Sequence, residues 1–156
     1  MRSLFVPAFI FILFSCSLST EQEMSLNKSM NNMIEARNTG DGLSYLNYTH
    51  PAVVKYFNKL GDSLLKQKFQ EVPESTSRYQ FDEDYIYWGS GYVKEVRNSD
   101  SIIQAKIEIM LYENHNLIDS TVTFYATSFE NESAWLFSIS TDYHSSYFPV
   151  EQRLFD

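Results

Sequence analysis

Hydrophobic residues in the first half of the chain recur every three or four positions, which is the period of a helix with one buried face. The clearest stripe consists of Leu26, Met30, Met33 and Ile34. The segment "NTGDG", residues 38–42, follows this stripe, and its two glycines predict the end of the helix. The pattern therefore predicts a long amphipathic helix that ends near Gly40.

A second helix is predicted to begin within "YLNYTHPAVVKYF", residues 45–57. Pro51 suits the first turn of a helix, because the N–H that proline lacks has no helical partner there. Thr49 or His50 would cap the free backbone donors of that turn. Gly61 would end the helix as a left-handed cap. We therefore expect a short helix between Pro51 and Gly61.

The second half of the chain changes to a period of two, which is typical of strands with one buried face. From Ile103 to Leu111, apolar residues alternate with polar ones. Strands are expected within residues 79–89, 90–97, 103–112, 117–128 and 134–141, with turns at 98–100, 113–116 and 129–133. Helices followed by a run of antiparallel strands predict an α+β fold with helices packed on one face of a sheet.

The first residues differ from both patterns. Arg2 precedes an apolar run from Leu4 to Phe14, and small residues follow it. The run is too short to cross a bilayer as a helix, which takes roughly 20 residues. We interpret residues 1–15 as a secretory signal peptide. The alternative, a mobile or buried N-terminal helix, would need apolar partners on every side.

The end of this segment, "LFSC", resembles the bacterial lipobox, in which a Leu, two further residues and an invariant Cys mark the cleavage site. Leu13, Ser15 and Cys16 match the motif, whereas Phe14 stands where small residues are usual. The resemblance implies cleavage before Cys16 and its diacylation, and two acyl chains are enough for stable membrane anchoring. The alternative is ordinary cleavage after Ser15 or slightly later, which would release a soluble protein.

Cys16 is also the only cysteine of the chain. A lone cysteine in an exported protein has no partner for a disulfide, and this favours lipidation. Residues 16–23 are then expected to be a polar tether, followed by a single domain over residues 24–156. The expected location is the bacterial cell envelope. The formal net charge of −8 argues against nucleic acid or an anionic membrane surface as the main partner.

The order of these elements resembles the nuclear-transport-factor-2-like superfamily, whose cone-shaped α+β fold is shared with ketosteroid isomerases. More narrowly, it is similar to small exported proteins of that superfamily from Bacteroidetes-type bacteria. The resemblance rests on "DGLSYLNYTHPAVVKYF" at 41–57, on the helix–strand boundary "KQKFQEV" at 66–72, and on "SAWLFSIS" at 133–140 with its proline-bearing tail. It covers residues 28–154.

This resemblance implies a cystatin-like cone, in which N-terminal helices pack on a curved antiparallel sheet of about four to six strands. It implies no activity, because the superfamily includes isomerases, dehydratases, scaffolds and proteins of unknown role. Many cone folds dimerise through the outer face of the sheet, so a homodimer is a further expectation.

Histidines are the first candidates for chemistry. His50 could act as a general base or ligand at the positive end of a helix. We favour a capping role, because a residue before proline is pushed out of helical geometry, and we expect His50→Ala to cost about 1 kcal/mol. His115 is expected in a solvent-exposed turn. Asp142 and His144 could share one face of an extended chain at the rim of the cone, beside Tyr143.

Catalysis of the ketosteroid-isomerase type needs a carboxylate base inside an apolar cone and groups opposite it that hold an oxyanion. Glu108 and Asp119 lie on the polar faces of their strands. If those faces line the cone, Glu108 would meet Tyr112 and Tyr125 in one pocket, and Trp88 completes this candidate pocket. Alternation favours the other outcome, in which these faces meet solvent.

The many aromatic residues of the strands are most simply core residues. The more specific alternative is an aromatic-lined pocket or a sugar-binding face. No metal-ligand spacing, nucleophile motif, phosphate loop or dinucleotide motif is present, so neither a catalytic residue nor a metal or other cofactor is predicted. The leading hypothesis is a lipid-anchored envelope protein that binds a small apolar molecule or a protein without catalysis. The alternative is an isomerase- or dehydratase-type enzyme that uses the cone cavity.

Overall fold

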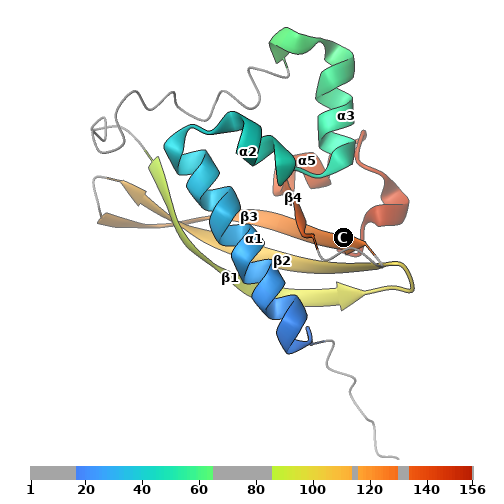
Figure 1. Ribbon diagram of the computed structural model, residues 1–156, viewed down its shortest axis with the longest axis horizontal. Coiled ribbons are helices and arrows are strands. Elements are labelled where there is room, and N and C mark those ends of the chain that lie inside the picture. Colours follow the sequence, from blue (N-terminus) through green and yellow to red (C-terminus); the bar gives the residue numbers. More distant parts are fainter. Residues whose placement is uncertain (1–16, 65–85, 114–115, 130–133, 156) are drawn as a thin grey trace, which may run out of the picture.

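Helices precede a four-stranded antiparallel sheet in the computed structural model, which describes residues 17–64, 86–113, 116–129 and 134–155 (Figure 1). The helices are α1 (Thr20–Thr39), α2 (Gly42–Asn47), α3 (Pro51–Leu60) and α5 (Ser140–Tyr143), with a 3-10 turn η1 (Val150–Gln152). The strands are β1 (Ile86–Asn98), β2 (Ile102–Glu113), β3 (Asn116–Phe129) and β4 (Leu136–Ile139), in the order β1-β2-β3-β4. This confirms the predicted α+β fold with N-terminal helices packed on a curved sheet.

Helix α1 begins earlier than the sequence suggested. Ser19 caps it, accepting a hydrogen bond from the Gln22 backbone, and the Gln22 side chain accepts one from the Ser19 backbone. This capping box makes the expected tether helical from Thr20 onward. The helix ends as predicted at Gly40, whose φ of 74° is the left-handed conformation that favours glycine.

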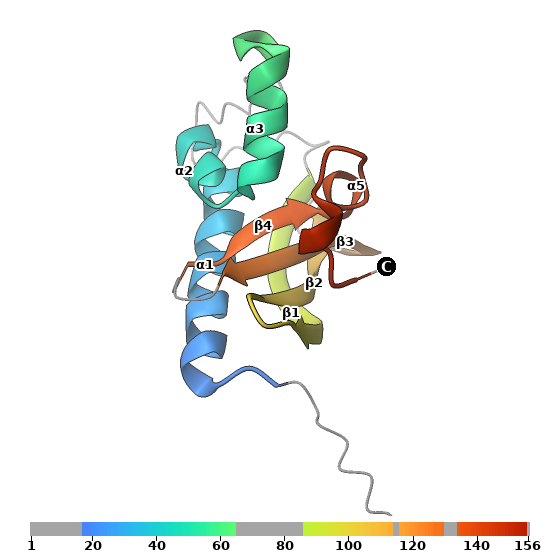
Figure 2. The ribbon, with the colours of Figure 1, turned by 90° about the vertical axis from the view of Figure 1, so that its right-hand side faces the viewer.

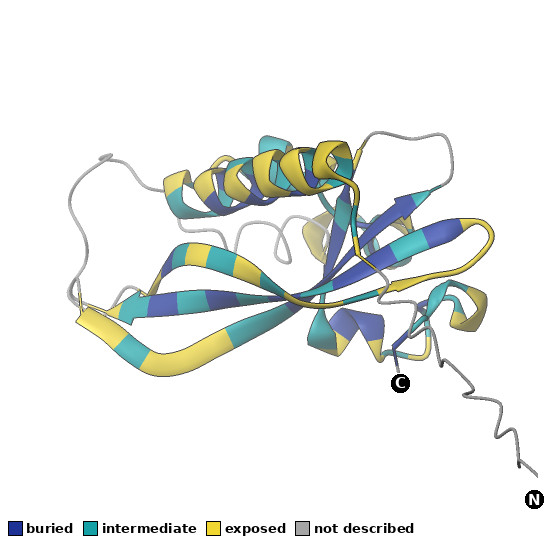
Figure 3. Ribbon diagram, turned by 90° about the horizontal axis from the view of Figure 1, so that it is seen from below, coloured by how far each residue is buried: buried dark blue, intermediate teal, exposed yellow. Residues whose placement is uncertain are grey.

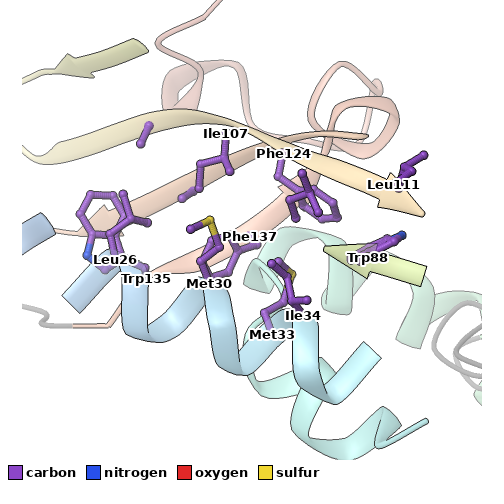
Figure 4. Close-up of a cluster of buried hydrophobic side chains, with 13 residues drawn as sticks. Leu26, Met30, Met33, Ile34, Trp88, Ile107, Leu111, Phe124, Trp135 and Phe137 are labelled. Carbon is purple, nitrogen blue, oxygen red and sulfur yellow. The ribbon is translucent and has the colours of Figure 1, made fainter. Parts of the chain in front are cut away.

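The predicted stripe of α1 packs on one face of the sheet, which we call the inner face (Figure 4). Its strand partners include the alternating residues of β2, as expected, and the fully buried Ile107 and Ile109 are among them. The whole cluster consists of Leu26, Met30, Met33, Ile34, Trp88, Ala105, Ile107, Ile109, Leu111, Phe124, Ala126, Trp135 and Phe137. Each fully buried large aliphatic side chain contributes about 1.5–3 kcal/mol, so this interface is the main source of stability.

Strand β1 is one continuous element, whereas the sequence predicted two strands interrupted near Gly89. Register shifts between Trp88 and Gly91, and between Val93 and Glu95, show that bulges absorb the irregular residues. Gly91 also lies directly beneath α1, since a Cβ there would be 2.6 Å from the sulfur of Met30. The glycines therefore allow a bend and a close helix approach rather than ending the strand.

The C-terminal residues cover part of the opposite, outer face of the sheet. Figure 2 shows α1 and the segment containing α5 and η1 on opposite sides of the strands. A second cluster forms there, made of Val53, Tyr125, Tyr143, Phe148 and Phe155. The outer face is thus buried near the C-terminus and open elsewhere.

The start of α3 is bound to the sheet through the backbone. His50 N donates to Phe137 O at 2.9 Å, and Phe137 N donates to Tyr48 O at 2.7 Å. Beyond this junction α3 projects from the sheet (Figure 2), and Val53 is its one buried residue. Gly61 ends the helix with φ 110° and ψ 156°, so it is not the left-handed cap that the sequence predicted, although its φ is positive.

Candidate functional site

The four residues of the predicted pocket lie on two different faces of the sheet. Trp88 pairs with Leu111 and is buried on the inner face. Glu108 and Tyr112 occupy the outer face, because they are four positions apart on β2 and alternate with its inner-face residues. Tyr125 lies on the same face, because it pairs with Lys106, two positions from Glu108. The sheet itself therefore separates Trp88 from the other three residues.

The C-terminal segment covers Tyr125 and so separates it from Glu108 and Tyr112 on the same face. Its ring stacks on Tyr143 with centroids 3.8 Å apart, and only 3% of Tyr125 is exposed. Its hydroxyl lies 3.1 Å from Nε2 of the exposed His144. Tyr125 is thus a core residue of the C-terminal cluster, although its strand alternation placed it on a polar face.

A polar cluster remains accessible on the uncovered part of the outer face. The Tyr92 hydroxyl donates to Glu108 Oε2 at 2.6 Å, and Lys94 Nζ donates to Glu108 Oε1 at 2.5 Å. Tyr92 is 47% exposed, whereas the Glu108 side chain is 12% exposed. The carboxylate on β2 therefore bonds to the tyrosine and to the ammonium group of the neighbouring strand β1.

These contacts also set the charge of the cluster. The hydrogen bond from Lys94, followed by that from Tyr92, lowers the pKa of Glu108. The hydrogen bond to Glu108 raises the pKa of Lys94 and of Tyr92. At neutral pH the cluster thus consists of a carboxylate, an ammonium and a neutral phenol.

A second row of side chains crosses the same face. Tyr87 pairs with Tyr112, which pairs with Leu117, and Tyr87 and Leu117 are 38% and 58% exposed. The Tyr112 ring lies over Gly89, where a Cβ would be 2.2 Å from Cε2 of the ring. Glu108 and Tyr112 are four residues apart, so the two rows are separated by about 13 Å.

We call this surface the open face and define it by six residues from three strands. They are Tyr87, Tyr92, Lys94, Glu108, Tyr112 and Leu117. Figure 3 shows the exposed and half-buried residues on the part of the sheet away from the C-terminus. Alternation predicted Glu108 and Tyr112 on one face. It did not predict Lys94, because the bulges of β1 change which residues share a face.

Chemically, the open face is suited to binding. Both oxygens of Glu108 already accept hydrogen bonds, and its pKa is lowered, so it is a weak base. What the face offers a ligand is exposed aromatic surface beside an ion pair. Asp119, the other predicted carboxylate, is exposed on β3.

His50 caps α3, as predicted. Its Nδ1 accepts a hydrogen bond from Ala52 N at 3.2 Å, and the ring is 1% exposed. Its Nε2 is buried without a hydrogen-bond partner, and the ring packs 4.6 Å from that of Phe148. Burial lowers the pKa of His50 to about 4, so the ring is neutral at pH 7.

Asp142 and His144 do not share a face of an extended chain, because residues 140–143 form helix α5. Asp142 is buried and accepts a hydrogen bond from the Tyr147 hydroxyl at 2.6 Å, whereas His144 is exposed. Tyr143 is buried in the C-terminal cluster. Cys16 and His115 lie outside the described residues.

No family model, curated protein or solved structure matches this chain. The resemblance to the nuclear-transport-factor-2-like superfamily therefore stays a prediction. Among the described residues, no three His, Cys, Asp or Glu side chains group to hold a metal ion. The described helices include none that is long and apolar enough to cross a membrane. Fold and site together define an α+β domain with a partly open, tyrosine-bearing sheet face.

Proposed function

We propose that this protein is a lipid-anchored protein of the bacterial envelope that binds saccharides on the open face without catalysis. The observation that carries the proposal is the half-exposed ring of Tyr92, which its hydrogen bond to Glu108 holds beside the Lys94 ammonium group. A saccharide combines apolar C–H faces with many hydroxyl groups. An aromatic ring flanked by charged hydrogen-bonding groups complements both features.

Pre-organisation supports a binding role. The ring of Tyr92 is held by a hydrogen bond, and the ring of Tyr112 is seated on Gly89. Side chains that are already ordered lose little conformational entropy when a ligand binds, which improves affinity. The second row of the open face extends the surface, so an oligosaccharide of several rings is needed to contact both rows.

The isomerase- or dehydratase-type alternative needs a carboxylate that can accept a proton from substrate. Glu108 is the predicted carboxylate nearest to that role, and its ion pair with Lys94 opposes protonation. The leading proposal therefore remains non-catalytic. A partner protein on the open face is another possible ligand, and the binding experiment distinguishes it from a saccharide.

We expect Tyr92→Ala to weaken saccharide binding at least tenfold, which corresponds to about 1.4 kcal/mol. Tyr92→Phe keeps the ring and loses only the hydroxyl, so we expect a smaller loss. Gly89→Ala should displace the Tyr112 ring and weaken binding of oligosaccharides more than that of monosaccharides. The measurement is isothermal titration calorimetry of the Cys16→Ser chain against peptidoglycan fragments and neutral oligosaccharides.

Leu43→Ala is the matched control, because Leu43 is 78% exposed on α2 and lies outside the open face. It should leave affinity unchanged. Equal affinity in the parent chain and Tyr92→Ala would contradict the proposal, as would the absence of binding to every saccharide. Capture of a single envelope protein through the same residues would replace saccharide with protein as the ligand.

The membrane anchor is tested separately. We expect the exported chain to incorporate a palmitate analogue and to partition into the detergent phase, because acyl chains on Cys16 supply the anchor. Cys16→Ser should abolish both behaviours without altering the fold. Persistence of labelling and partitioning in that variant would show that Cys16 is not the lipidation site.

A further inference from the structure

A groove lies on the helical layer, lined by the C-terminal half of α1, by α2 and by the residues that flank α2. These two helices are neighbours in the fold (Figure 1). Its volume is about 290 Å³, and eight residues line it. The residues that present polar groups include Asn32, Glu35, Thr39, Asp41, Ser44 and Tyr48. The volume is close to the lower end of the range of small-molecule sites, which is about 300 Å³. The groove shares no residue with the open face.

Two hydrogen bonds order polar groups that line the groove. Asp41 caps α2, since its Oδ1 accepts from Ser44 N at 3.0 Å. Tyr48 accepts a hydrogen bond from Asn32 Nδ2 at 3.0 Å. Ala36, also in the lining, is buried and gives the groove a small apolar floor. The bond between Asn32 and Tyr48 thus joins α1 to the residue that follows α2 across the groove.

The lining is rich in hydrogen-bond acceptors and negative in charge. Glu35 and Asp41 are its ionisable carboxylates, and none of its eight residues is Lys, Arg or His. Hydrogen bonds from Ser44 lower the pKa of Asp41, so this carboxylate is ionised at neutral pH. Carboxylates are acceptors only, and an ammonium group is a donor only. The groove therefore complements a ligand that carries positive charge and several N–H donors.

We propose that this groove binds a small organic cation bearing one or more primary ammonium groups. A bare metal ion fits less well, because the described residues hold no group of three metal-ligating side chains. A neutral polyol would leave the two negative charges without a partner. Binding is expected to weaken as salt rises, because both carboxylates lie on exposed residues.

Spermidine is the probe, and sorbitol is the neutral probe of comparable size. We expect the Cys16→Ser chain to bind spermidine with one-to-one stoichiometry in isothermal titration calorimetry, and nuclear magnetic resonance shifts should centre on residues 32–48. Glu35→Gln and Asp41→Asn should each weaken binding about tenfold. Asp41→Asn is informative because asparagine also caps helices well, so α2 should persist.

Glu151→Gln is the matched control, because it removes the same charge from an exposed residue on η1. It should change affinity less than twofold. An equal loss in Glu151→Gln would show general attraction to an acidic chain and overturn the proposal. Tighter binding of sorbitol than of spermidine, or no binding of spermidine, would overturn it as well. None of these outcomes bears on the open face.

Discussion

Gln104→Met will lower the free energy of unfolding by about 3 kcal/mol and loosen the C-terminal segment. Gln104 is fully buried in the outer face of β2. Its Nε2 donates to Thr127 Oγ1 at 2.9 Å and to Gln152 O at 2.6 Å. Its Oε1 accepts from the Tyr143 hydroxyl at 2.7 Å and from Leu154 N at 2.8 Å. One side chain thus joins β2 to β3, α5 and the C-terminus.

Methionine has nearly the same length and shape as glutamine, so little space is left empty by this substitution. The loss comes from buried donors and acceptors that no longer have partners, each costing about 1–3 kcal/mol. Urea unfolding gives the change in stability. Hydrogen exchange at the amides of Leu154 and Phe155 should accelerate far more than exchange in β2, since both amides donate into this network.

Thr127→Val is the matched control for the network. It removes one acceptor hydroxyl with little change of shape, and Gln104 keeps its other three partners, so we expect a loss of about 1 kcal/mol. If Gln104→Met costs no more than Thr127→Val, the network does not hold the C-terminal segment. The burial of Phe148 and Phe155 would then account for its position.

The second large effect is a loss of stability in mild acid that depends on His50. The ordinary pKa of histidine is about 6.5, and burial lowers that of His50 to about 4 in the folded chain. Between these values the unfolded chain binds a proton that the folded chain does not. The contribution of neutral His50 to the free energy of unfolding is therefore fully present above pH 6.5. It falls by about 3 kcal/mol as the pH drops toward 4.

The surroundings of His50 explain why the folded chain resists protonation. Its ring contacts those of Phe148 and Phe129, and no described acidic side chain pairs with it. A second proton would force Nδ1 to give up the hydrogen bond that it accepts from Ala52 N. The imidazolium would then be both unpaired and poorly solvated.

Urea unfolding at several pH values between 4 and 7.5 measures this effect, with His50→Asn as the comparison. Asparagine caps helices well but does not titrate. We expect His50→Asn to be less stable at pH 7, because the buried ring is lost, and the gap to the parent should narrow as the pH falls. Carboxylates titrate in both chains and cancel in the difference. Parallel stability curves would show that His50 does not titrate in this window.

The same surroundings change the expected cost of His50→Ala. The sequence suggested the loss of a cap alone, about 1 kcal/mol. Because the ring is buried against Phe148, the substitution also leaves a cavity, and we expect a larger loss. A cap can be recognised from neighbouring residues, but its burial depends on a segment almost a hundred positions away.

The features that depend on short-range patterns could be predicted from the sequence. The stripe from Leu26 to Ile34 and the stop at Gly40 follow from helical periodicity and backbone freedom. The buried face of β2 follows from strict alternation, and the capping role of His50 follows from its place before Pro51. Each of these rests on neighbours within one or two turns or a few strand positions.

Which parts of the outer face are covered depends on packing between distant segments, so no local pattern predicts it. Alternation placed Gln104 and Tyr125 on polar faces that meet solvent, and both are buried by residues that follow them by 18 to 50 positions. The bulges of β1 then set which side chains join Glu108, and they bring Lys94 to it. These outcomes come from long-range contacts, whose partners no local pattern identifies.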